Sequence, residues 1–233
     1  MFFRLWNGLV NALAIKQSCL ICKQISAQLI CRICCNDLEQ FDLEQCQGNL
    51  LNLPAIEQVY SKLDAQALFA VAPYQWPLAN LLTQLKFSNK IIHAQAIANL
   101  FNAALQKTNT TLPQAIIPIP LHSSRFRQRK YNQALEIAEF IAKTNSLILD
   151  VGHCLRHKAT QPQTSLSGAQ RRQNIRNAFT LASPLPYQHI AIFDDIVTTG
   201  TTVNELIRCI RQHNPHIQID VWCICVSLAN KHL

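Results

Sequence analysis

The hydrophobic and polar positions of this chain follow two periods, which predict alternating strands and helices over most of its length. Short, nearly continuous apolar runs have the length of buried strands, and they lie at residues 67–72, 115–120, 147–151, 190–193 and 217–226. Between these runs apolar residues recur at helical spacing, over residues 78–85, 91–105, 131–143 and 203–210. Strands that alternate with helices favour a parallel sheet flanked by helices, so we expect an α/β fold.

The first fifteen residues carry apolar positions that fit one face of a helix, among them Phe2, Trp6 and Leu13. A signal peptide is the alternative interpretation. Against it, Asn7 and Asn11 interrupt the apolar stretch, and no small-residue cleavage site follows. We therefore expect a packing helix, no membrane-spanning segment and a cytoplasmic protein.

The length and composition suit one domain of good size with a small attachment. The chain has 233 residues, of which 49% are hydrophobic and 15% are charged, as in globular proteins with a sizeable core. The cysteine-dense beginning runs into a Gln-, Leu- and Asn-rich tract that ends near Pro54. We expect a small N-terminal module over residues 1–54 and a larger domain over residues 55–233.

The net charge of +8 is concentrated in one region. Residues 122–180 hold ten Lys and Arg side chains against three acidic ones, which accounts for all but one of the excess positive charges. A basic balance confined to one region indicates an anionic ligand there.

Two CxxC pairs lie close together near the start of the chain. Their members are Cys19, Cys22, Cys31 and Cys34. Each pair can present two thiolates to one metal, so the spacing predicts a structural, tetrahedral zinc site. Disulfides are the alternative, but they would need an oxidising compartment that nothing else in the sequence supports. Cys35 could replace Cys34 as the fourth ligand.

The stretch 190–202 combines a buried strand, an acidic pair and a hydroxyl-rich turn that leads into a helix. Asp194 and Asp195 end the strand, and the turn around Gly200 contains Thr198, Thr199, Thr201 and Thr202. Carboxylates accept hydrogen bonds from ribose hydroxyls or help to hold hydrated Mg²⁺. The amino end of a helix binds phosphate. This order of residues therefore predicts a site for a phosphorylated sugar.

The same stretch resembles the motif with which type I phosphoribosyltransferases bind 5-phosphoribosyl-1-pyrophosphate (PRPP). Two polar, basic loops precede it, at residues 121–130 and 155–179. Together with the cysteine pairs, these segments resemble the ComF family of competence-associated phosphoribosyltransferase-like proteins over nearly the whole chain. The resemblance includes Lys86, Arg125, Arg129, Asn132, Gln133, Arg156, Thr160, Arg171 and Asn174.

The resemblance implies a type I phosphoribosyltransferase-like sheet with an N-terminal zinc ribbon. It also implies that Asp194 and Asp195 meet the ribose hydroxyls of PRPP and that residues 198–202 surround its 5-phosphate. The negative charge of the departing, Mg²⁺-bound pyrophosphate would be stabilised by Arg125, Arg129 and Arg171. Residues 160–172 would form a flexible lid, and Lys86 would belong to the hood over the second substrate.

One position departs from the family pattern. Relatives usually have glycine before the aromatic residue of a Gly-Phe-Asn-Gln stretch, whereas this chain has Lys130 before Tyr131. If the backbone needs a positive φ at this point, lysine is strained there.

Three functions are compatible with these features. The first is an enzyme that displaces pyrophosphate from PRPP, within natural transformation and DNA uptake. The second is a PRPP sensor without turnover. The third is a competence factor whose zinc module and basic face bind single-stranded DNA, with other competence proteins as possible partners. The sequence leaves open the nucleophile and the oligomeric state.

Overall fold

The computed structural model describes residues 17–88, 91–159 and 173–228. The chain divides into two compact units, Met1–Leu38 and Glu39–Leu233. The helix expected over the first fifteen residues lies outside the described residues. Within the described part of the chain, no helix has the length and apolar character needed to cross a membrane.

From residue 17 on, where the structure describes it, the smaller unit consists of two short strands and one short helix. Strands β1 (Gln17–Ser18) and β2 (Ile25–Ser26) pair in antiparallel fashion, and α2 (Arg32–Asn36) follows. The turn between the strands closes where the backbone N–H of Lys23 donates to the carbonyl of Cys19 at 3.0 Å. Cys31 caps α2 with its sulfur. Both cysteine pairs are therefore held in tight backbone turns.

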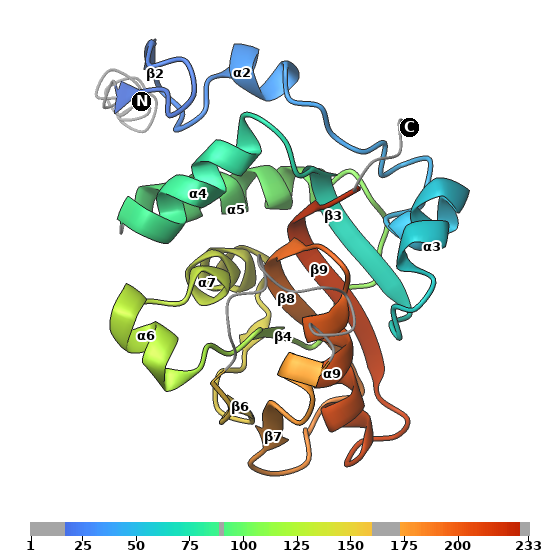
Figure 1. Ribbon diagram of the computed structural model, residues 1–233. Helices are drawn as coiled ribbons and strands as arrows, with labels where there is room; N and C mark the ends of the chain where they lie inside the picture. Colours follow the sequence, from blue (N-terminus) through green and yellow to red (C-terminus); the bar gives the residue numbers. More distant parts are fainter. Residues whose placement is uncertain (1–16, 89–90, 160–172, 229–233) are drawn as a thin grey trace, which may run out of the picture. The chain divides into compact units, whose positions relative to one another are not determined.

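The larger unit contains a five-stranded parallel sheet in the order β3-β9-β8-β4-β5 (Figure 1). Its strands are β3 (Ala67–Pro73), β4 (Ala115–Pro118), β5 (Ile148–Leu149), β8 (His189–Val197) and β9 (Gln218–Val226). The expected parallel α/β sheet is confirmed. Since all strands run the same way, the carboxyl ends of β4 and β8 meet at one edge of the sheet.

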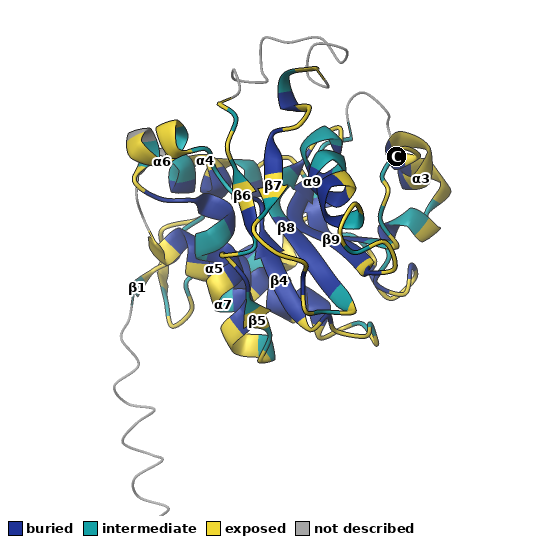
Figure 2. Ribbon diagram, turned by 90° about the horizontal axis from the view of Figure 1, so that it is seen from below, coloured by how far each residue is buried: buried dark blue, intermediate teal, exposed yellow. Residues whose placement is uncertain are grey.

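Helices cover both faces of this sheet. On one face lie α5 (Ile91–Leu105) and α7 (Gln133–Asn145), with α4 (Leu78–Ser88) against α5. On the other lie α9 (Thr201–Arg211) and α3 (Pro54–Tyr60). The Tyr60 hydroxyl on α3 donates to the carbonyl of Val197 at the end of β8, at 2.9 Å. Two layers of helices thus bury most residues of the central strands β3, β4, β8 and β9 (Figure 2).

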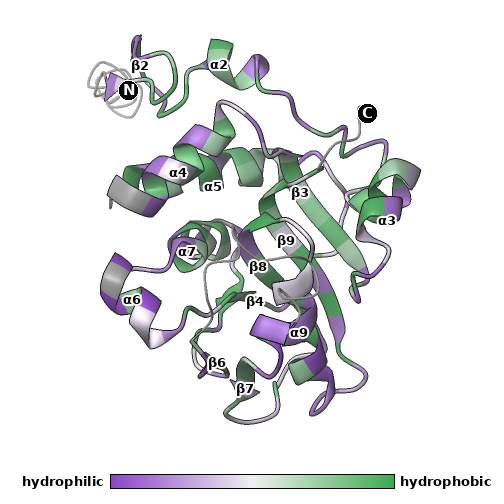
Figure 3. Ribbon diagram, viewed as in Figure 1, coloured by the Kyte–Doolittle hydropathy of each residue, from purple (hydrophilic) through white to green (hydrophobic). Residues whose placement is uncertain are grey.

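Aromatic rings join α5 to the centre of the sheet. The ring of Phe101 on α5 lies 4.8 Å from Phe69 on β3, 5.4 Å from Trp222 on β9 and 5.9 Å from Phe193 on β8. Hydrophobic residues run along the same strands in Figure 3. Each of these rings removes a large apolar surface from water, and their tilted contacts add about 1 kcal/mol per pair. The core therefore fixes β8, the strand that carries the acidic pair.

Several elements differ from those expected. The basic loop at 121–130 contains a helix, α6 (Ser123–Arg129), because His122 caps its amino end by accepting from the N–H of Ser124. An antiparallel pair, β6 (Cys154–Arg156) with β7 (Phe179–Leu181), frames the polar segment that follows. The strand expected at 147–151 shortens to the two residues of β5.

The division between the units falls at Leu38, earlier than the expected boundary near Pro54. Residues after Leu38 bond to the large sheet. The N–H of Phe41 donates to the carbonyl of Val71 at 3.0 Å, and the side chain of Asn49 accepts from the N–H of Leu68 at 3.0 Å. A short 3₁₀ helix, η1 (Leu50–Asn52), buries Leu50 completely. The composition of this polar stretch does not indicate these hydrogen bonds to the sheet.

Candidate functional site

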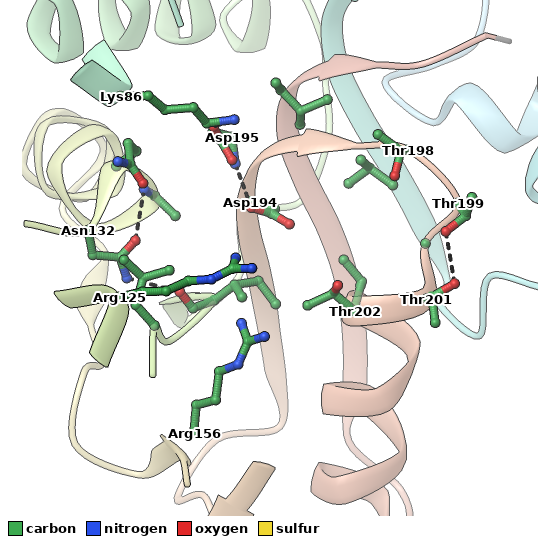
Figure 4. Close-up of a pocket in the computed structure, with 18 of the residues that line it drawn as sticks. Lys86, Arg125, Asn132, Arg156, Asp194, Asp195, Thr198, Thr199, Thr201 and Thr202 are labelled. Atoms are coloured by element: carbon green, nitrogen blue, oxygen red, sulfur yellow. Dashed lines mark hydrogen bonds and ion pairs between the residues drawn. The ribbon is translucent and has the colours of Figure 1, made fainter. Parts of the chain in front are cut away.

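The loop between β8 and α9 makes a tight turn at Gly200. Gly200 caps α9 with a left-handed backbone, φ 68°, and a Cβ atom there would lie 3.1 Å from the Leu63 side chain. The hydroxyls of Thr199 and Thr201 bond to each other at 2.8 Å across the turn (Figure 4). Glycine therefore lets the backbone turn tightly enough to aim the first N–H groups of α9 outward.

The acidic pair lies directly before this turn and is braced by a lysine from another helix. The Nζ of Lys86 on α4 lies 3.0 Å from the Oδ2 of Asp195, and the N–H of Asp195 donates to the Oδ1 of Asp194 at 2.9 Å. The hydroxyl of Tyr131 donates to the carbonyl of Leu85 and so holds the end of α4 beside the pair. Lys86 thus reaches the acidic pair itself.

The surroundings shift the pKa values of Asp194 and Lys86. Burial raises the pKa of Asp194 well above its usual value, and the charge of Asp195 raises it further. Burial acts to lower the pKa of Lys86, but the charges of Asp195 and Asp194 outweigh it and the net pKa is raised. Lys86 therefore stays charged, while Asp194 keeps its proton to higher pH than a free aspartate.

Three arginines gather opposite the threonine turn. Arg125 and Arg129 come from α6, and Arg156 comes from β6. Burial and the charge of Arg125 lower the pKa of Arg156 to about 10, and burial and Arg129 lower the pKa of Arg125. Because the positive charges of these arginines repel one another, an anion bound among them would relieve the repulsion. Arg171, the third arginine expected here, lies outside the described residues.

Gln133, the first residue of α7, presents a buried amide to the same space. Arg129 donates through Nη1 to the Oε1 of Gln133 at 3.1 Å. Arginine has no acceptor, so this bond fixes the orientation of the amide. The Nε2 of Gln133 is buried and lacks a hydrogen-bond partner among the described residues. Such an atom costs about 1–3 kcal/mol until an acceptor reaches it.

These groups surround one pocket of about 430 Å³. Its lining includes Tyr74, Lys86, Arg125, Arg129, Asn132, Gln133, Arg156, Asp194, Asp195 and residues 198–203. The amino ends of two helices, α7 and α9, contribute to it. The structure thus brings together all the predicted sugar-phosphate residues with Arg125 and Arg129. Such a pocket can hold a ligand with a diol at its centre and anionic groups on either side.

Arg156 and Gln133 belong to the stretches that resemble the ComF family, but no role in the site was predicted for either residue. Arg156 reaches the pocket only because the β6–β7 pair turns it inward, where its guanidinium also lies 5.6 Å from the centre of the Phe179 ring. Gln133 follows Asn132, whose side chain caps α7. An amide directly after a cap residue is a usable signal, because the first turn of a helix faces the same ligand as its free N–H groups.

Lys130 has the strained backbone that its departure from the family pattern suggested. It ends α6 in the left-handed region, with φ 70°, and its N–H donates to the carbonyl of Phe126 at 2.7 Å. This geometry is the one in which a helix end favours glycine.

We expect Lys130→Gly to raise the free energy of unfolding by about 1 kcal/mol, because glycine removes the left-handed strain. Urea denaturation followed by circular dichroism measures this change. Lys130→Ala is the control, since alanine keeps the Cβ atom and should bring no gain. An equal gain in both variants would attribute the effect to the lysine side chain instead.

The four paired cysteines of the smaller unit gather into one cluster. The sulfurs of Cys19, Cys22, Cys31 and Cys34 all lie within 4.8 Å of one another, and those of Cys22 and Cys31 are 3.8 Å apart. Tetrahedral zinc with bonds of about 2.3 Å requires sulfurs about 3.8 Å apart. Cys34 belongs to the cluster, whereas the thiol of Cys35 lies 3.7 Å from the carbonyl of Ile30. Thiolate chemistry and spacing both fit zinc.

Similar proteins carry names connected with DNA utilization or competence. The chain is 36% identical over 167 residues to the DNA utilization protein YhgH of Escherichia coli O157:H7, covering 70% of this chain and 73% of that protein. It is 32% identical over 211 residues to Competence protein F of Haemophilus influenzae, covering 86% of each. The YhgH protein of E. coli K12 is 35% identical over 167 residues, covering 70% of this chain and 73% of that protein. No family model matches the chain.

Proposed function

The chain belongs to the ComF family, and from this premise we propose that it binds PRPP in the pocket at the end of β8 and displaces its pyrophosphate. The observation that carries the proposal is the set of groups that line one pocket. A helix amino end with threonine hydroxyls, the acidic pair and three arginines beside a second helix amino end all border it. This set suits the 5-phosphate, the ribose diol and the pyrophosphate of PRPP.

Each group has a definite task in this proposal. The threonine turn and the first N–H groups of α9 hold the 5-phosphate. Asp194 and Asp195 accept hydrogen bonds from the ribose hydroxyls, with Lys86 keeping Asp195 in place. Arg125, Arg129 and Arg156 hold the pyrophosphate. Mg²⁺ bound to the pyrophosphate would shield part of its charge.

The reaction would be a substitution at the anomeric carbon of PRPP. A nucleophile forms a bond to that carbon while the bond to the pyrophosphate oxygen breaks, and the pyrophosphate leaves with the electron pair. The arginines stabilise the negative charge that develops on the leaving group. Lys86 and Tyr74 lie toward the strand β3 and helix α4 side of the pocket, so this side would receive the nucleophile.

Titration calorimetry with PRPP and Mg²⁺, followed by a screen of amines and nucleobases for pyrophosphate release, tests the proposal. Binding with release supports an enzyme. Binding without release, for every nucleophile tried, supports a sensor and overturns turnover. Failure of PRPP to bind at all would overturn the whole assignment.

We expect Gln133→Glu to lower the affinity for PRPP by about tenfold or more. The substitution replaces a buried donor by a carboxylate that repels the anion, and it leaves an acceptor for Arg129. Calorimetry measures the change. Gln188→Glu, an equal change of charge at an exposed residue before β8, should leave the affinity unchanged. Equal affinities in wild type and Gln133→Glu would remove Gln133 from the site.

A role in DNA uptake follows for this chain from the names of its relatives, and we propose it at that level. We also propose that the cysteine cluster holds structural zinc, which suits a reducing compartment such as the cytoplasm. The arginine-rich α6 makes single-stranded DNA a second candidate ligand. A binding constant for oligonucleotides that falls steeply with salt would favour it.

A further inference from the structure

A second pocket, of about 630 Å³, lies on the other side of α6 from the pocket described above. Its walls come from the end of β4, from α6, from the start of α7 and from the β6–β7 pair. The apolar lining residues are Pro118, Pro120, Leu121, Phe126, Leu135, Val151, Cys154 and Leu155. The polar ones are Ser123, Arg127, Asn132, Arg156, His157 and Thr180. Among the described residues, no carboxylate lines it.

Helix α6 separates the two pockets and gives each a different set of side chains. Arg125 and Arg129, four residues apart and hence on one face of the helix, line the first pocket. Phe126 and Arg127 line only the second. The helix therefore presents an aromatic ring and a guanidinium together to a space that PRPP would not occupy.

Apolar side chains around this second pocket are unusually exposed. Phe126 and Leu155 are each 48% exposed, and Val151 is 56% exposed. They come from three separate segments, yet they border one hollow. Large apolar residues that gather on the surface around a concavity mark a binding site. None of the three belongs to the buried core.

The chemistry of the lining selects a planar aromatic ligand that carries negative charge. Phe126 offers a ring for stacking, and Leu155 and Val151 offer apolar contact. The hydroxyls of Ser123 and Thr180 can pair with the polar edge of a base. Arg127, which lines only this pocket, can bind a phosphate. We propose that this second pocket binds a nucleotide, with its base against Phe126 and its phosphate on Arg127.

Calorimetric titration with thymidine monophosphate and with an eight-nucleotide oligothymidylate, at low salt, tests this site. We expect wild type to bind at least one of them, and Phe126→Ala to weaken binding about tenfold or more. Arg127→Glu should weaken it as well. Lys143→Ala, which removes an exposed cation at the end of α7, should bind like wild type.

Comparison of the two probes identifies the source of the nucleotide. Equal affinity supports a free nucleotide, and tighter, salt-sensitive binding of the oligonucleotide supports a single strand. Absence of binding by either probe, or unchanged binding in Phe126→Ala, overturns the site. Phe126 does not line the first pocket, so a failure of PRPP to bind in the same samples would leave this result standing.

Discussion

Replacement of both Asp194 and Asp195 by asparagine is expected to lower the affinity for PRPP by at least about a hundredfold. Each carboxylate would accept a charged hydrogen bond from a ribose hydroxyl, and such bonds contribute about 1.5–3 kcal/mol apiece. Asparagine keeps the size of the side chain but loses the charge. Titration calorimetry with PRPP and Mg²⁺ measures the loss.

The single variant Asp194→Asn separates binding from stability. Because the pKa of Asp194 is raised in the folded protein, mainly by burial, the folded chain holds a proton that the unfolded chain releases. Its contribution to stability is therefore lost as pH rises from the usual aspartate pKa through the raised one. Asparagine removes this loss, so the melting temperature at neutral pH should rise by a few degrees while PRPP affinity falls.

Glu139→Gln is the control for these variants, because Glu139 is an exposed carboxylate on α7. It should leave PRPP affinity unchanged. Unchanged PRPP affinity in the double asparagine variant, with circular dichroism showing a folded protein, would contradict the placement of the ribose.

The second large effect concerns the cysteine cluster. We expect Cys31→Ser to abolish stoichiometric zinc binding and to unfold the smaller unit. Cys31 supplies one sulfur of the cluster and also caps α2. Structural zinc in small modules contributes about 10–16 kcal/mol of apparent binding free energy. Metal analysis of the purified chain gives the zinc content, and limited proteolysis near residue 38 reports the unfolding.

Cys35→Ser is a closely matched control, because it changes the neighbour of a ligand without touching the cluster. It should retain one zinc ion per chain. Loss of zinc from Cys35→Ser but not from Cys34→Ser would show that Cys35, and not Cys34, is the fourth ligand. Full zinc content in Cys31→Ser would contradict the four-cysteine site.

The local pattern predicted the parts of the site that lie next to one another in sequence. Arg125 and Arg129, which meet them only in the fold, were predicted through the family resemblance instead. Asp194, Asp195 and Gly200 share one stretch, where strand, turn and helix leave a local pattern. Arg156 comes from an edge pair whose strands are three residues each, too short to show a period. The bond between Lys86 and Asp195 spans more than a hundred residues, and no local pattern encodes it.

The fold shows the same division. The long apolar strands β8 and β9 and the helix α5 follow directly from their periodicity. Helix α6 was missed because its seven residues carry no apolar stripe. Its cap at His122 and its left-handed end at Lys130 define it instead. The stretch between Leu38 and Pro54 was expected in the small N-terminal module, whereas the N–H of Phe41 and the side chain of Asn49 hydrogen-bond to β3.

Helix α6 forms part of the wall of both pockets, so a movement of this helix would affect both sites. Leu121, Asn132 and Arg156 border both pockets, and the seven residues of α6 serve one pocket with one face and its neighbour with another. A ligand that shifts this helix from one side changes affinity on the other. Reciprocity then requires the same factor in both directions. Binding of a nucleotide in the second pocket would then change the affinity of the protein for PRPP.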